Sequence, residues 1–279
     1  MNRSSRCAVL AAICLFSTCC STGPTPPKPG TPAFYWNAAK TAYAAGDYQK
    51  TSENLENVAR TENEYTNRAL AWNLVLMSGL VNGNMRIADS FEYGGKANRA
   101  NPTPFRRQMT TYRTYAAQTA PHFAEAFAAF MKGNKDPKVT LDFAFPAGNA
   151  NPPTDLDKVA KGELLPDAAM EDASRLAVSS AVVRAACAAA GAPEDKAKAE
   201  AVFARQPAEV PRETFLLAMA NALYDQSQLY SREKLDQPPR MQVFISQAQD
   251  TLKQLPESKD TKALAEKIQK ALKPEKSRK

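Results

Sequence analysis

The amino-acid sequence predicts an all-α fold of antiparallel helical hairpins, interrupted by one irregular segment at about residues 133–165. Alanine dominates the middle and C-terminal thirds, glycine accounts for only 11 of the 279 residues, and β-branched runs are few. Alanine loses no side-chain entropy in a helix, so this composition favours helix almost throughout. Apolar residues also recur at spacings of three and four, which is typical of amphipathic helices.

Size and charge limit the class of protein. A chain of 279 residues, 44% of them hydrophobic, can bury a core without disulfide bridges. The formal net charge is +7, and two of the basic residues, Arg3 and Arg6, lie in a predicted leader. The other basic residues concentrate near the end of the chain, at Lys259, Lys262, Lys267, Lys270, Lys273, Lys276, Arg278 and Lys279. We expect a solvated helix face there, with contact to an anionic lipid or cell-wall polymer as the alternative.

Residues 1–19 have the three parts of a secretory signal peptide. Arg3 and Arg6 form a positive N-terminal region, residues 7–16 form a short apolar run, and the small residues Ser17 and Thr18 follow. A membrane-spanning helix needs roughly 20 apolar residues. The leader is therefore expected to be cleaved, and the mature chain to be exported. We expect no nucleic-acid partner for an exported chain.

The cysteines that follow indicate a lipid anchor. Cys19 and Cys20 come directly after the apolar run and lead into a Pro-rich tether, residues 20–32. This arrangement resembles a bacterial lipoprotein leader, in which the first mature cysteine receives lipid. The resemblance implies lipidation at Cys19, with Cys20 as the alternative. It also implies the outer membrane, facing the periplasm, because no Asp follows either cysteine; a soluble periplasmic protein is the alternative.

The first helical hairpin is predicted within residues 33–59. Two runs with helical periodicity flank Gly46 and Asp47, which form the turn. Gly46, Asp47 and Tyr48, with the small Thr51 five residues after the glycine, resemble the turn of a tetratricopeptide repeat. That family consists of helix-turn-helix units of 34 residues.

A second unit of this kind is predicted around Gly83. Trp72 stands eleven residues before that glycine and Ala88 five after it, which are the spacings of the repeat family. We therefore predict tetratricopeptide-like hairpins over residues 33–100. The resemblance implies a concave groove that binds a peptide, a chain terminus or another subunit. Four residues near the candidate groove helices are expected to serve packing: Tyr43, Tyr48, Trp72 and Asn73.

A further hairpin is predicted over residues 101–132. Pro121 is expected to open its second helix, whose buried face would carry Phe123, Phe127 and Phe130. His122, the only histidine, is expected to be a surface or capping residue in the first turn of that helix.

The irregular segment 133–165 carries one period-two pattern. Val139, Leu141, Phe143 and Phe145 alternate with Thr140, Asp142 and Ala144, which hints at a short strand. No second strand pattern is evident in the chain, so an extended segment packed over the helices is expected. Asp155 and Asp157 lie close together but lack the regular series of oxygen ligands that calcium loops contain, so we expect no metal there.

The C-terminal region, residues 166–273, is predicted to be helical, with a basic tail at 274–279. Pro166 is suited to the first position of a helix that ends at Gly191. A charged helix follows Pro193, an apolar one follows Pro211, and a helical pair follows Pro239. Cys187 lies in an apolar helical run and is expected to be a small buried side chain.

No catalytic constellation is evident. One histidine and one cysteine in the body exclude the common zinc sites, and no phosphate-binding glycine motif occurs. Two carboxylates such as Glu163 and Asp167 could act on a glycoside, but nothing marks them as a pair. We expect no enzyme activity, no cofactor and no metal.

The predicted function is that of an exported, lipid-anchored scaffold for other envelope proteins or peptides. One alternative is a solute-binding or transporter-accessory lipoprotein with a ligand cavity between its helices. A wall-active enzyme is a second alternative.

Overall fold

A computed structural model describes residues 26–272. The predicted signal peptide, Cys19, Cys20, the first part of the tether and the basic tail lie outside the described residues. The elements in chain order are α1 (Pro32–Ala44), α2 (Tyr48–Ala59), α3 (Thr66–Ala97), α4 (Thr103–Gly133), β1 (Lys138–Leu141), α5 (Asp155–Ala160), α6 (Asp167–Ala189), α7 (Lys196–Phe203), β2 (Ala208–Pro211), α8 (Arg212–Ser227), the 3-10 helix η1 (Gln228–Tyr230), α9 (Pro238–Leu252) and α10 (Lys259–Leu272).

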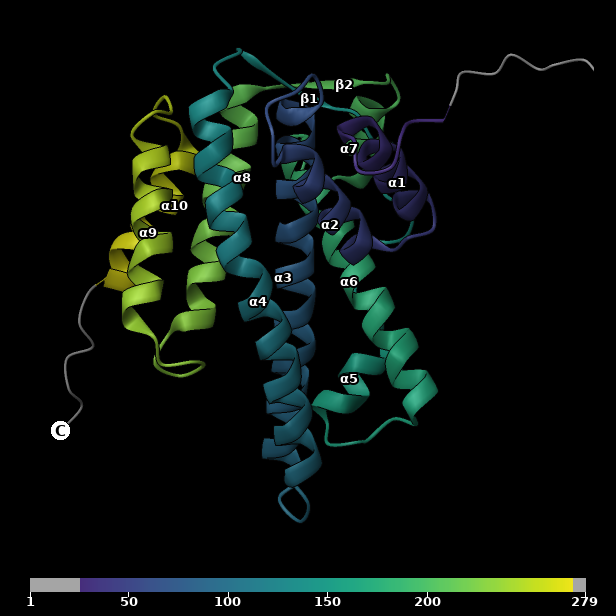
Figure 1. Cartoon of the computed structure of the whole chain (residues 1–279). Helices are drawn as coiled ribbons and strands as arrows, with labels where there is room; N and C mark the ends of the chain where they lie inside the picture. The colour runs from purple at the N-terminus through teal and green to yellow at the C-terminus, as the bar shows by residue number, and fades with distance from the viewer. Residues whose placement is uncertain (1–25, 273–279) are drawn as a thin grey trace, which may run out of the picture.

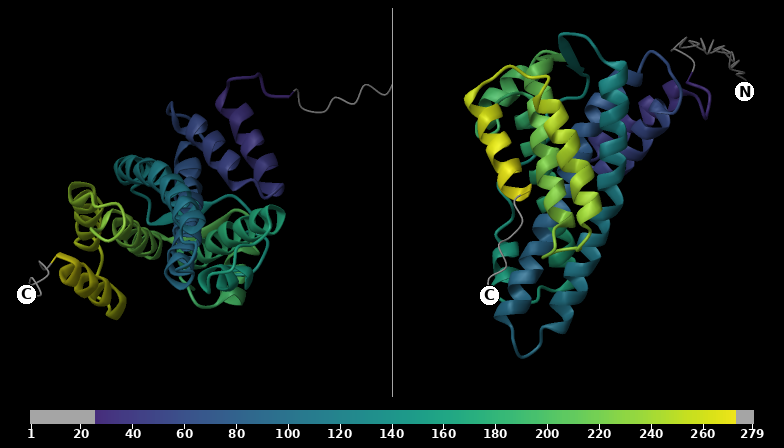
Figure 2. Two further views of the ribbon diagram at one scale, coloured as in Figure 1. Left: turned by 90° about the horizontal axis from the view of Figure 1, so that it is seen from below. Right: turned by 90° about the vertical axis from the view of Figure 1, so that its left-hand side faces the viewer.

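Two long antiparallel helices, α3 and α4, form the centre of the molecule (Figure 1). Helices α8, α9 and α10 lie on one side of this pair, and α1, α2 and α6 lie on the other (Figure 1). The loop that joins α3 to α4 projects at the opposite end from β1 and β2, as two further views also show (Figure 2). The all-α prediction is confirmed, because the described residues contain only one two-stranded sheet.

The first predicted hairpin is confirmed. Helix α1 ends at Ala44 and α2 begins at Tyr48, with Gly46 at φ 75° in the turn. Only glycine adopts this left-handed conformation without a steric penalty. The Asp47 carboxylate accepts a hydrogen bond from the N–H of Lys50 at 3.0 Å and so caps α2.

The second predicted hairpin is wrong, since α3 runs through Gly83 as one helix of 32 residues. Gly83 is used for close packing instead of a turn. A Cβ on Gly83 would lie 2.8 Å from the Cα of Val178, and one on Gly79 would lie 2.6 Å from the Cα of Val182. Both valines belong to α6, so the glycines let α3 and α6 approach closely. Spacing alone cannot distinguish a glycine in a turn from one at a helix crossing.

The predicted hairpin at 101–132 is also wrong, because α4 continues through Pro121. A proline in a helix interior removes one backbone hydrogen bond, and the helix persists only where packing compensates. Here Phe123, Phe127 and Phe130 are buried as predicted and hold the second half of α4 on the core.

The period-two pattern does form a strand, but the expectation that it lacks a partner is wrong. Strand β1 pairs antiparallel with β2, with Val139 opposite Val210 and Leu141 opposite Ala208. Strand β2 is only four residues long and ends at Pro211, which is too short for its own alternation to be recognised. The segment 133–165 also contains α5.

An aromatic cluster joins the first hairpin to the strands. The rings of Trp72 and Phe143 stack with centroids 5.5 Å apart and an interplanar angle of 2°. Tyr43 packs edge-on against both rings, and its hydroxyl donates a hydrogen bond to the carbonyl of Ala144 at 2.7 Å. Burial raises the pKa of the Tyr43 phenol, and neighbouring Tyr48 raises it further, so the group remains a donor.

The helices of the C-terminal region agree with those predicted from the sequence. Helix α6 begins directly after Pro166, and Gly191 follows its end with φ 73°. Helices α7, α8 and the closing pair α9–α10 occupy the predicted runs. Cys187 is buried as predicted, and burial raises the pKa of its thiol. Within residues 26–272, every helix falls short of the combined length and apolar character that a membrane span requires.

Candidate functional site

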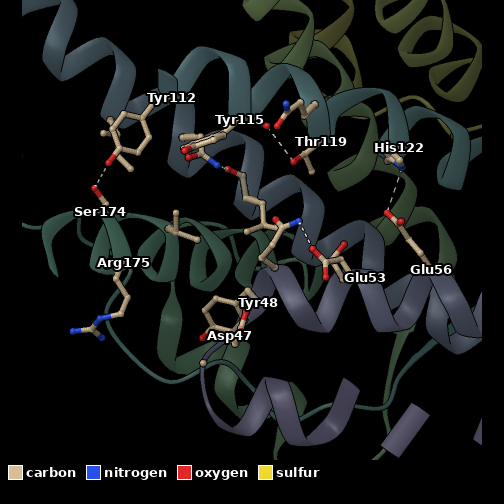
Figure 3. A pocket seen from close by; sticks show the side chains of 18 of the residues that line it. Asp47, Tyr48, Glu53, Glu56, Tyr112, Tyr115, Thr119, His122, Ser174 and Arg175 are labelled. Carbon is tan, nitrogen blue, oxygen red and sulfur yellow. Dashed lines mark hydrogen bonds and ion pairs between the residues drawn. The ribbon is translucent and has the colours of Figure 1, made fainter. Parts of the chain in front are cut away.

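An open groove with a volume of about 890 Å³ lies between α2, α4 and α6 (Figure 3). Its floor comes from α3, and the turn between α1 and α2 forms part of its edge. The volume is at the upper end of the range typical of ligand pockets, roughly 300–1,000 Å³.

The floor is mostly apolar. Leu80 and Ile87 of α3 are buried, and Val178 of α6 lies beside them. Leu80, Asn84 and Ile87 follow one another at spacings of four and three, which places them on one face of α3. The Asn84 side chain donates to the carbonyl of Leu80 at 2.8 Å, so its amide is held along the helix.

The α4 wall carries a row of polar and aromatic side chains. Four of them follow helical spacing and face the groove in Figure 3, namely Tyr112, Tyr115, Thr119 and His122. Gln118 also lines the groove. Tyr115 is 50% exposed, so its ring is accessible from solvent. The hydroxyls of Tyr112 and Ser174 lie 2.7 Å apart, so this hydrogen bond links α4 to α6 at one end of the groove.

The α2 wall is acidic. Glu53 accepts a hydrogen bond from the Gln49 amide at 3.1 Å, and Glu56 lies one turn further along the same helix. Burial raises the pKa of Glu56, although neighbouring His122 acts in the opposite direction. His122 Nδ1 lies 3.6 Å from Glu56 Oε1, so these side chains link α2 to α4 at the other end of the groove.

Of the four aromatic and polar residues placed near groove helices, only Tyr48 lines the groove. Tyr43 and Trp72 belong to the aromatic cluster, and Asn73 is buried with its amide oxygen 2.6 Å from the Ser52 hydroxyl. Packing therefore accounts for these three, as predicted.

His122 is on the surface as predicted, although it lies within α4 and not in a first turn. Glu163 and Asp167 are both exposed and lie outside the groove. Asp155 pairs with Lys158 at 2.8 Å. In the part of the chain that the structure describes, no three His, Cys, Asp or Glu side chains gather in a way that could hold a metal ion.

Sequence reasoning missed the α4 wall. The spacing of Tyr112, Tyr115, Thr119 and His122 could have identified it, because these residues share one helix face. The predicted break at Pro121 divided this row between two helices and concealed it.

This arrangement is suited to binding. It combines an apolar floor with tyrosines and exposed hydrogen-bonding groups on the walls, a combination common in recognition surfaces. Glu53 and Glu56 share one helix and one wall. Glycoside cleavage, in contrast, uses carboxylates that flank the scissile bond.

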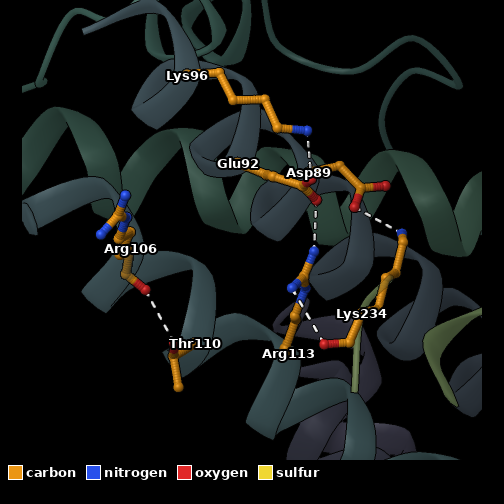
Figure 4. Close-up of polar contacts among 7 residues, drawn as sticks. All are labelled: Asp89, Glu92, Lys96, Arg106, Thr110, Arg113 and Lys234. Atoms are coloured by element: carbon orange, nitrogen blue, oxygen red, sulfur yellow. Dashed lines mark hydrogen bonds and ion pairs between the residues drawn. The ribbon is translucent and has the colours of Figure 1, made fainter. Parts of the chain in front are cut away.

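A second polar cluster joins α3, α4 and the loop before α9 (Figure 4). The buried Arg113 guanidinium bonds Glu92 at 2.5 Å, and Lys234 bonds Asp89 at 2.7 Å. Burial alone would raise the pKa of Glu92. The hydrogen bond from Lys96 and the charge of Arg113 outweigh burial and lower this pKa. The Lys234–Asp89 pair holds the loop against α3, and the Arg113–Glu92 pair joins α4 to α3.

Comparisons of the chain with protein-family models, with curated proteins and with solved structures find no significant match.

Proposed function

We propose that this protein is an exported, lipid-anchored envelope protein that acts as a helical scaffold, and that a segment of another envelope protein or a peptide binds in the groove between α2, α4 and α6. The outer membrane, facing the periplasm, is the proposed location. The groove is the observation that supports the proposal most directly, because it exposes aromatic and polar side chains over an apolar floor.

The shape of the groove favours a segment of polypeptide. Walls of helices on either side of an apolar floor provide the kind of surface on which peptide segments dock. On the rim, Tyr115 is 50% exposed and the His122 side chain is 58% exposed, so a polypeptide chain can enter the groove from solvent. An exposed tyrosine also supplies large contact area at low entropic cost.

Site-specific photo-crosslinking in the native host tests this proposal. A photoreactive phenylalanine analogue would replace Tyr115 in the groove. In the matched control it would replace Tyr93, which is 60% exposed on α3 outside the groove. We expect protein adducts from position 115 that position 93 does not give. Absence of adducts at 115, or the same adducts at both positions, would contradict the proposal.

The anchor has a separate test. Mass spectrometry of the mature N-terminus is expected to show a lipid on Cys19, or on Cys20 if cleavage falls one residue later. Cys19→Ala should abolish or displace the modification. An unmodified mature N-terminus would contradict lipidation and would favour a soluble periplasmic protein.

The volume of the groove also suits a small solute, and this is the observation in favour of a solute-binding lipoprotein. Native mass spectrometry of protein purified from the envelope would detect a retained solute. A retained solute, together with no adducts at position 115, would favour this second function.

A further inference from the structure

The charge of the groove differs in sign from that of the rest of the body. Residues 26–272 carry a formal +2, because residues 1–25 contribute two positive charges and residues 273–279 a net three to the total of +7. The side chains that line the groove include the carboxylates of Asp47, Glu53 and Glu56 but only one cation, Arg175. An acidic groove in a basic protein selects for a cationic occupant.

The groove's own cation does not neutralise these carboxylates. Arg175 pairs with Asp172 at 3.0 Å, and its guanidinium points away from Glu53 and Tyr115 (Figure 3). Among the described residues, neither Glu53 nor Glu56 forms an ion pair with a lysine or arginine. Glu53 bonds the neutral Gln49 amide and Glu56 contacts the His122 ring, while Arg60 acts on Glu56 only as a nearby charge that lowers its pKa.

The aromatic wall faces the acidic one. Tyr115 lies on α4 across the groove from Glu53 on α2 (Figure 3). Tyr112 packs edge-on against Tyr115 with ring centroids 5.9 Å apart, which steadies the exposed ring. A cation between these walls would gain a charge-assisted hydrogen bond from the carboxylate and a favourable contact with the ring face.

From this juxtaposition, and resting on the proposed function of the groove, we infer that its occupant is a peptide segment bearing a lysine or arginine next to apolar residues. The cationic head lies between Glu53 and Tyr115. The aliphatic stem and the apolar neighbours pack on Val178 and Tyr112, which line the groove and are partly exposed, above the buried Leu80 and Ile87. Lysine and arginine suit this arrangement because their stems pack on apolar surface while their heads remain solvated or paired.

Selection from a random peptide display library on the chain without its leader tests the inference. We expect peptides rich in lysine or arginine, and their binding should be lost with Tyr115→Ala. Glu53→Gln should weaken a selected peptide by about 2- to 5-fold, because Glu53 is exposed and an exposed ion pair contributes up to about 1 kcal/mol. The control Glu266→Gln, on the exposed face of α10, should leave affinity unchanged.

The outcomes separate the two proposals. Suppose that binding of the selected peptides depends on Tyr115, but the peptides lack basic residues or bind the Glu53→Gln variant with unchanged affinity. The inference of a cationic occupant would then be wrong, and the groove would still be a peptide-binding site. If no selected peptide depended on Tyr115, both proposals would fail. Circular dichroism of each variant, matching wild type, would show that lost binding is not lost folding.

Discussion

The contact between α3 and α6 makes a strong prediction for Gly79→Ala. A methyl group at this position would lie 2.5 Å from Val182 Cγ2, 2.6 Å from its Cα and 2.8 Å from its backbone nitrogen. A rotation of the Val182 side chain could relieve the first clash only. The other two involve backbone atoms, so α3 and α6 must move apart.

The magnitude follows from two opposing effects. Replacing glycine by alanine in a helix gains up to about 1 kcal/mol from propensity. Overpacking in a well-packed core costs about 1–3 kcal/mol or more, and a clash with backbone belongs at the upper end of that range. We therefore expect Gly79→Ala to lower the free energy of unfolding by about 2 kcal/mol, which corresponds to a fall in Tm of about 4–8 °C for a chain of this size.

Urea and thermal unfolding monitored by far-UV circular dichroism would measure this loss. Gly133→Ala is the matched control, because the nearest atom to its added methyl is Asn67 Oδ1 at an ordinary 3.4 Å. This control should be neutral or slightly stabilising. A Gly79→Ala protein as stable as wild type would refute the close approach of α3 and α6.

The remaining predictions concern buried polar groups. Glu92→Gln should lower stability at pH 7 by about 1–3 kcal/mol, less than for a fully buried pair, because it leaves Arg113 without its charged partner. Since the folded-state pKa of Glu92 is lowered, its contribution is present above pH 4.5 and is lost as pH falls below that value; urea titrations should show a shallower acid decline in the variant. Tyr43→Phe should cost about 1 kcal/mol by chemical denaturation, because the carbonyl of Ala144 loses its donor. In a chain without its leader and with Cys20 absent, Cys187 should react with a thiol reagent only on unfolding; rapid reaction of the native chain would contradict its burial.

Local sequence signals accounted for much of the secondary structure. The Gly46–Asp47 turn, the start of a helix after Pro166 and its end at Gly191 depend on backbone preferences of neighbouring residues. Such preferences act over a few residues and can therefore be recognised in the chain itself. Burial of Phe123 and Cys187 likewise follows from apolar periodicity.

The failures share one cause, which is that tertiary packing overrode a local signal. The sequence around Gly83 predicts a turn, but Gly83 lies inside α3 where that helix crosses α6. Pro121 predicts the start of a helix, but α4 continues through it because the aromatic residues that follow are buried in the core. Strand β2 is recognised only from its pairing with β1, about 70 residues earlier in the chain.

The sequence by itself determined the helical class and the first hairpin. Only the tertiary structure decided that α3 and α4 are long central helices and that an acidic α2 wall faces tyrosines of α4. The physical reason is distance along the chain. Glu53 and Tyr115 are 62 residues apart, and no local propensity specifies which faces of two distant helices meet across a third.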